Sequence, residues 1–208
     1  MIDSVERFSN RVDNYVKHRP DYPREIISLL ASNCGLTRES VVADIGCGTG
    51  ISTRMFLDNG NRVFGVEPNA AMRIAAEKYL SEYPWFIAAD GTSEATGLLD
   101  SSIDFVVAAQ AFHWFDPQRS RTEFERILKP NGHIVLMWNE RQLDSTPFLI
   151  DYESFLVKYA IDYGKVRHEN IKTEDLASFF ETDFGSAAFE NEQVFDLDGL
   201  KGRMLSSS

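Results

Sequence analysis

The sequence predicts an α/β fold with a Rossmann-like, doubly wound, mostly parallel sheet and helices on both faces. Two observations support this prediction. Short runs of β-forming residues alternate with apolar stretches of helical period, which is the pattern of β-α units. The first runs are continuously apolar, as strands buried on both faces require. A chain of 208 residues is long enough for one domain with a sizeable core.

The elements are expected in this order. A first helix begins at Asp21 and stops at Cys34-Gly35, where the glycine ends it. The strand-like runs are 41–45, 62–66, 85–89, 103–109 and 132–138. The helical stretches between them are 51–59, 69–80 and 117–128. After the fifth strand the pattern gives helices at 146–162 and 173–183, a strand at 187–195, and further helix from Leu197.

The first strand runs into a glycine-rich loop. Residues 44–50 read D-I-G-C-G-T-G, with a glycine at every second position. Such glycines let the backbone approach a ligand closely and adopt positive φ angles, and open α/β sheets bind ligands at the carboxyl ends of their strands. The dinucleotide fingerprint G-x-G-x-x-G needs a glycine where this chain has Ile51, and the P-loop pattern also fails.

Two acids define the ligand that this loop is expected to hold. The carboxylate of Asp44, at the mouth of the loop, repels a pyrophosphate and suits a cationic end such as an ammonium or a sulfonium. Glu67 ends the second strand, about 20 residues past Gly46 along the sequence. An acid at this separation from a glycine loop is placed to accept ribose hydroxyls. A ligand with a ribose, a cationic amino-acid end and no pyrophosphate is S-adenosylmethionine, and its product is S-adenosylhomocysteine.

With these motifs and three later ones, the chain resembles the class I S-adenosylmethionine-dependent methyltransferases of the small-molecule type. Residues 43–50 match the first motif of that family, and 66–69 followed by Met72 match its second-strand motif. The third-strand end, the fourth strand and the turn into the fifth resemble 86–91, 102–107 and 128–133. The resemblance implies the doubly wound fold and methyl transfer from S-adenosylmethionine.

The resemblance also implies the contacts of the cofactor. Asp90 would meet the adenine amino group, and Gln110 would offer its backbone to the methionine end. An N-terminal lid would bring Tyr15 and Arg19 to the cofactor's carboxylate. The expected cofactor-binding residues are Tyr15, Arg19, Asp44, Gly46, Cys47, Gly48, Thr49, Gly50, Glu67, Pro68, Met72, Asp90, Gly91, Thr92, Gln110 and Ala111.

The segment after the fourth strand is expected to line the substrate pocket. His113 is the obvious general-base candidate near the methyl group; its alternative role is to close the pocket by packing, together with Trp114. The expected reaction is in-line methyl displacement onto an O, N or C nucleophile. A Pro-Pro pair is absent from the sequence, and with it the Asn-Pro-Pro-Tyr-type motif of base and glutamine N-methylation, which favours a small-molecule substrate.

The resemblance divides one domain, 1–208, into three parts. An N-terminal lid with helices occupies 1–35, the cofactor-binding core 41–138, and substrate-cap helices with an incomplete sheet edge 146–208. The family's sheet ends in an antiparallel hairpin whose last strand is missing from this sequence. We therefore expect a truncated or split form of a longer chain, with an exposed sheet edge.

The net charge and the cysteine content limit the classes of partner and the cellular location that are expected. The net charge of −11 argues against a nonspecific nucleic-acid binder, which needs a basic face. The two cysteines have neither a zinc-site spacing nor a disulfide framework, so no metal and a cytoplasmic location are expected. A signal peptide and a membrane-length apolar run are both absent from the sequence.

Two other classes of function stay open. A nicotinamide oxidoreductase is one, although Ile51 stands where its third glycine belongs. A non-catalytic member that binds the nucleoside as a sensor or scaffold is the other, because the closing strand is missing.

Overall fold

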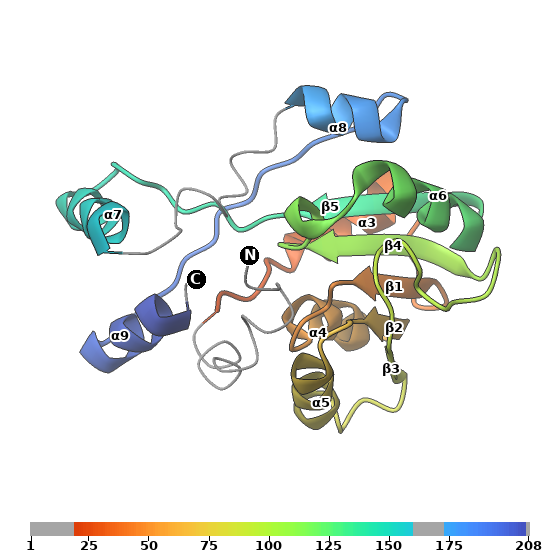
Figure 1. The fold of residues 1–208 in the computed structure, drawn as a ribbon, viewed down its shortest axis with the longest axis horizontal. Coiled ribbons are helices and arrows are strands. Elements are labelled where there is room, and N and C mark those ends of the chain that lie inside the picture. The colour runs from red at the N-terminus through yellow and green to blue at the C-terminus, as the bar shows by residue number, and fades with distance from the viewer. Residues whose placement is uncertain (1–18, 160–172, 207–208) are drawn as a thin grey trace.

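The computed structural model describes residues 19–159 and 173–206, and its centre is a five-stranded sheet (Figure 1). The strand order is β3-β2-β1-β4-β5, and every pairing is parallel. The strands are β1 (Val41–Ile45), β2 (Arg62–Val66), β3 (Phe86–Ala89), β4 (Ile103–Ala109) and β5 (Leu128–Met137). The order reverses between β1 and β4, so the sheet has a topological switch point there. The predicted doubly wound α/β class is confirmed.

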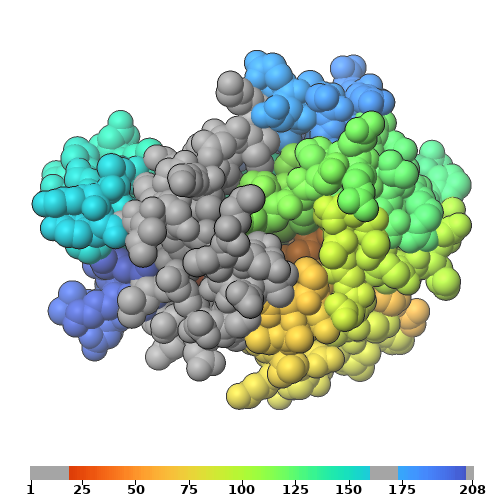
Figure 2. Space-filling view, in the orientation of Figure 1, coloured from red at the N-terminus to blue at the C-terminus, as the bar shows by residue number. Residues whose placement is uncertain are grey.

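Helices lie on both faces of this sheet. The helices of the described residues, of which α7 and α9 stand away from the sheet (Figure 1), are α3 (Glu25–Cys34), α4 (Ile51–Asn59), α5 (Ala70–Tyr79), the 3₁₀ helix η1 (Phe112–Trp114), α6 (Pro117–Ile127), α7 (Pro147–Tyr159), α8 (Thr173–Phe180) and α9 (Leu197–Ser206). Figure 2 shows α8 lying over the segment of α6, whereas α7 and α9 stand at the opposite end of the molecule (Figure 1).

The core consists of two clusters, one on each face of the sheet, because successive side chains of a strand point to opposite faces. One cluster joins α3 and α4 to one face of the sheet, through Leu30, Phe56, Val42, Val63 and Phe105. The other joins α6 and α8 to the opposite face, through Phe124, Phe179, Ala43, Ile45 and Val106. Burial on both faces explains why the central strands are continuously apolar.

Several predicted boundaries agree with the structure residue for residue, namely those of β1, β2, β4 and α4. The first helix begins at Glu25 rather than at Asp21, and it ends as predicted, with Gly35 in the left-handed conformation at φ 70°. The fifth strand begins at 128, not at 132. Leu128 pairs with Ile103, and the register then shifts so that His133 pairs with Phe105. The expected turn is therefore an irregularity inside β5.

The strand predicted at 187–195 is wrong. Among the described residues the segment has no ladder partner, and its residues 187–194 are exposed, Val194 to 87%. An isolated strand is not stable in water, and in the described part of the chain no strand pairs with the outer edge of β5. The helix expected from Leu197 is α9.

Candidate functional site

The glycine loop after β1 has the conformation that only glycine adopts without strain. Gly46, Gly48 and Gly50 have φ angles of 69°, 56° and 89°. An added Cβ would lie 2.7 Å from Ala111 at Gly46 and 2.7 Å from Leu80 at Gly50, whereas at Gly48 it would meet nothing within 4 Å. Two of the glycines are therefore required by protein packing, and the third faces open space at the carboxyl end of the sheet.

The loop is also fastened to the next strand. The backbone N–H groups of Gly46 and Cys47 donate to the carbonyl of Val66 at 2.8 and 3.2 Å. Burial, with the charges of Asp44 and Glu67 added, raises the pKa of the Cys47 thiol well above its usual range. Cys47 is thus a neutral packing residue whose contribution to the loop comes from its backbone.

Asp44, at the end of β1, is fully buried beneath the loop. Its Oδ2 accepts hydrogen bonds from the hydroxyls of Ser52 and Thr53, both at 2.7 Å, while its Oδ1 has no hydrogen-bond partner. Burial raises the pKa of Asp44 to about 6, although the two hydroxyls act in the opposite direction. The hydroxyl of Thr49 is likewise buried without a partner. Buried polar atoms are nearly always bonded, so these two atoms can accept or donate a bond to a polar ligand or to an ordered water.

Glu67, at the end of β2, connects two loops. Its Oε2 accepts from the backbone N of Gly48 at 3.0 Å, and its Oε1 accepts from the backbone N of Asn69 at 2.9 Å. Burial raises the pKa of Glu67, and these bonds lower it less strongly. Each carboxylate oxygen keeps a further lone pair that can accept a hydroxyl.

The start of α5 continues this edge of the site. Asn69 caps the helix by accepting from the backbone N of Ala71 and of Met72. Met72 is buried, with 3% exposure, whereas Pro68 is exposed. Asn69 stands beside the predicted Pro68, and its role as the cap is a signal that the sequence carries.

Arg73 is a residue of the site that the sequence analysis missed. Its Nη1 donates to the carbonyls of Glu67 and Pro68 at 2.7 and 3.1 Å, and lies 3.1 Å from Asp90 Oδ1. Arg73 follows the Asn69 cap by one helical turn, a spacing that places both at the strand ends.

The third acid, Asp90, follows β3, and its side chain is 74% exposed. The loop behind it is tight: Thr92 N donates to Ala95 O at 3.1 Å, and Ala95 N to Thr92 O at 3.3 Å. A Cβ added to Gly91 would lie 2.7 Å from the carbonyl oxygen of Thr96. The structure thus places Asp90, Gly91 and Thr92 beside the ends of β2 and β3.

Gln110 directly follows β4 and has a left-handed conformation, with φ at 55°. Its backbone N donates to Met137 O at 2.9 Å, and its side-chain Nε2 donates to Asn139 O at 3.0 Å. Non-glycine residues in this region cost about 1–3 kcal/mol and cluster at functional sites. The next residue, Ala111, packs against Gly46, so the end of β4 contacts the glycine loop.

His113 and Trp114 lie in η1, directly after this turn. Their ring centroids are 4.8 Å apart. His113 is half-buried and Trp114 is 40% exposed. The neighbouring Phe112 packs in the core against Phe179, with ring centroids 4.7 Å apart, so η1 is firmly anchored.

Most of the predicted cofactor-binding residues therefore lie at the carboxyl ends of four adjacent strands, β3, β2, β1 and β4. Arg19 is half-buried at the start of the described residues, and Tyr15 lies outside them. In residues 19–159 and 173–206 no group of three or more His, Cys, Asp or Glu side chains could hold a metal ion. Across the same residues no helix is long and apolar enough to cross a membrane.

A parallel sheet with a glycine loop after β1 and an acid directly after β2 is the arrangement with which open α/β sheets hold a nucleoside at their strand ends. The family model described as a methyltransferase domain matches residues 43–136. An uncharacterised methyltransferase of Mycobacterium tuberculosis is 37% identical over 134 residues, which cover 64% of this chain and 52% of that protein. An uncharacterised methyltransferase-like protein of Schizosaccharomyces pombe is 30% identical over 76% of this chain and 60% of its own length.

The fold is also found in solved structures of methyltransferases. A crystal structure of an S-adenosylmethionine-dependent methyltransferase from Aquifex aeolicus has the same fold, with a TM-score of 0.59, 16% identity, and coverage of 83% of this chain and 86% of that one. Residues 43–136 therefore belong to the methyltransferase-domain family, and the fold is that of a solved S-adenosylmethionine-dependent methyltransferase. The chain spans between half and two thirds of the length of the two curated relatives described above.

Proposed function

We propose that this protein transfers a methyl group from S-adenosylmethionine to an O, N or C atom of a small molecule and leaves S-adenosylhomocysteine. The observation that carries this proposal is the pair of acids at adjacent strand ends. Asp44 Oδ1 is buried without a partner, and Glu67 holds the loop at Gly48, beside which a side chain would meet no protein atom within 4 Å.

The residues present fit this cofactor in chemical character. Asp44 Oδ1 would accept from the cationic amino-acid end, which compensates a buried charge. Glu67 would use its remaining lone pairs for the ribose hydroxyls. The adenine would be met by Asp90, Gly91 and Thr92, and the methionine end by Gln110, Ala111 and the lid residues Tyr15 and Arg19.

The cofactor supplies an already activated methyl group, so the protein has mainly to orient the acceptor and to exclude water. His113 would accept a proton from an acceptor whose nucleophilic atom carries one. A carboxylate acceptor needs no base, and His113 would then only close the site with Trp114. We assign the cap over the acceptor to the helices after residue 146.

The partners that we propose are a small-molecule substrate and neither a nucleic acid nor a membrane. The net charge of −11 opposes binding to a phosphate backbone. Because the two cysteines provide no disulfide framework, we place the protein in the reducing cytoplasm.

Calorimetry with S-adenosylmethionine and S-adenosylhomocysteine tests the cofactor. We expect both to bind, and we expect Glu67→Ala to weaken binding by about tenfold or more, because it removes a charge-assisted acceptor and frees the Gly48 loop. Glu77→Ala, an exposed change on α5, is the matched control and should leave the affinity unchanged. Absence of binding at high micromolar ligand contradicts the proposal.

Label transfer tests the reaction itself. Incubation with methyl-labelled cofactor and a pool of small metabolites should give labelled products of low molecular mass. Transfer of the label to RNA or protein alone would contradict the small-molecule assignment while leaving methyl transfer in place.

A further inference from the structure

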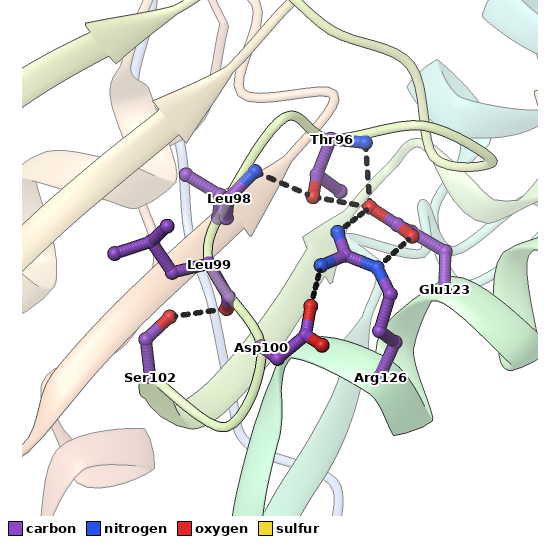
Figure 3. Close-up of polar contacts among 7 residues, drawn as sticks. All are labelled: Thr96, Leu98, Leu99, Asp100, Ser102, Glu123 and Arg126. Carbon is purple, nitrogen blue, oxygen red and sulfur yellow. Dashed lines mark hydrogen bonds and ion pairs between the residues drawn. The ribbon is translucent and has the colours of Figure 1, made fainter.

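An ion-paired carboxylate on α6 holds the loop that follows β3. Glu123 is 8% exposed, and its Oε1 accepts hydrogen bonds from the backbone N and the hydroxyl of Thr96 at 2.8 and 2.5 Å. Arg126 donates to both oxygens of Glu123, at 2.6 and 2.8 Å, and also pairs with Asp100 (Figure 3). The loop is thus fastened to one helix at two points.

The ion pair between Glu123 and Arg126 persists over the whole physiological pH range. The hydrogen bonds from the Arg126 guanidinium, with those of Thr96, hold the pKa of Glu123 at about 2, although burial acts in the opposite direction. Glu123 is therefore ionised at every physiological pH. Thr96 itself is 1% exposed, and its hydroxyl also accepts from the backbone N of Leu98 at 3.2 Å.

Thr96, which Glu123 holds, contacts Gly91 at the beginning of the loop. A Cβ on Gly91 would lie 2.7 Å from Thr96 O and 3.0 Å from Ala95 O, so the two sides of the loop are in direct backbone contact. A second contact to the start of α6 supports the same loop, because Asp116 N donates to Glu94 Oε1 at 3.0 Å. A shift of Thr96 would therefore shift Gly91 as well.

We infer that Glu123 is a positioning residue for recognition of the adenine base: through Thr96 it holds Asp90, Gly91 and Thr92 where they distinguish adenine from other bases. This inference rests on the proposed function, which assigns these three residues to the adenine. Arg73 reaches Asp90 from the other side, at 3.1 Å from Oδ1, so the acid is held between α5 and a loop that α6 fixes.

The experiment compares two ligands that differ only in the base. S-Adenosylhomocysteine carries the adenine amino group, and S-inosylhomocysteine carries an oxygen in its place. We expect the wild type to prefer the adenine ligand. We expect Glu123→Ala to weaken S-adenosylhomocysteine by about tenfold and to bring the ratio of the two dissociation constants close to one. Glu125→Ala is the matched control, because Glu125 lies on the same helix and pairs with Arg121 at 2.7 Å; it should change neither affinity.

The selectivity ratio separates positioning from mere stability, because a general loosening of the fold weakens both ligands equally. An equal loss, or no loss, for Glu123→Ala overturns the inference, as does a wild type that binds both ligands alike. If Glu123→Ala does not fold, Thr96→Val is the second variant: it removes the hydroxyl bonds to Glu123 and from Leu98 N and keeps the backbone bond to Glu123. An unchanged ratio in that variant overturns the inference too. A wild type that binds neither ligand contradicts the proposed function itself.

Discussion

At the scale of single residues, Asp44 carries charge where charge is costly. Its carboxyl pKa is raised from 3.8 to about 6 by burial. Because the folded-state pKa lies above the unfolded one, the folded protein binds more protons between these two values, and its stability falls as the pH rises through that window. Above about pH 6 the ionised Asp44 lowers the free energy of unfolding by about 1–3 kcal/mol.

Asp44→Asn should therefore stabilise the protein without ligand at about pH 7 and bring little gain at about pH 4, where the native carboxyl is already protonated. It should also weaken S-adenosylmethionine, which loses its charged acceptor. Thermal unfolding at the two pH values and calorimetry measure the effects. Asp151→Asn, an exposed change on α7, is the control. A gain of equal size at both pH values would show that Asp44 is not the titrating group.

The glycines of the loop give a second prediction. Gly48→Ala adds a methyl group that meets no protein atom within 4 Å, so its cost is the left-handed backbone strain of about 1–2 kcal/mol. Gly46→Ala adds a collision with Ala111 at 2.7 Å and should cost more. Urea unfolding should rank the two variants in this order.

Cofactor affinity should distinguish the same variants in another way. The Gly48→Ala protein should stay folded and lose most of its affinity for S-adenosylhomocysteine, because the methyl group occupies the open side of the loop. Undiminished binding by folded Gly48→Ala would place the ligand elsewhere.

The sequence predicts the loop and its acids because a strand, its loop and the next helix are contiguous. It does not predict what touches them. Ser52 and Thr53 bond Asp44 only once α4 has packed under the loop. Glu123 meets Thr96 across 27 residues of chain, and no local pattern reports such a contact.

At the scale of elements, strands that are buried on both faces are predicted best, because burial alone decides their composition. The elements at the β5 edge of the sheet are predicted worst, whereas the other edge strand, β3, begins one residue later than predicted. β5 begins earlier than expected because Leu128 finds a partner in Ile103. The apolar residues at 187–195 have strand propensity, but propensity yields where no ladder is available.

The helix α8 gives a prediction at this scale. Phe179 is its buried residue, at 3% exposure, and its ring lies 4.7 Å from that of Phe112 and 6.3 Å from that of Phe124. Phe179→Ala should cost about 3–5 kcal/mol in a site that cannot collapse, and less if α8 detaches first. Hydrogen exchange should show lost protection in α8, and Phe184→Ala, at 36% exposure, should not. Unchanged protection in α8 of Phe179→Ala would mean that other contacts dock this helix.

At the scale of the whole molecule, the outer edge of β5 favours association with another chain, and the net charge opposes it. β5 is ten residues long, and in the described part of the chain its outer side pairs with no strand. A long unpaired edge is a template for pairing with another chain. The net charge of −11 opposes such association through repulsion between molecules.

The salt concentration should therefore determine whether edge pairing or charge repulsion dominates. The screening length falls from about 10 Å at 0.1 M to about 3 Å at 1 M salt, so repulsion weakens while backbone pairing does not. We expect the molar mass from sedimentation to rise with protein concentration at about 1 M salt and to remain that of the monomer at low salt. Infrared spectra should then show an added intermolecular β-sheet band, which separates edge pairing from association through the exposed apolar side chains of α7, such as Phe148 and Val157. A protein that stays monomeric at high salt would show that its edge is covered in solution.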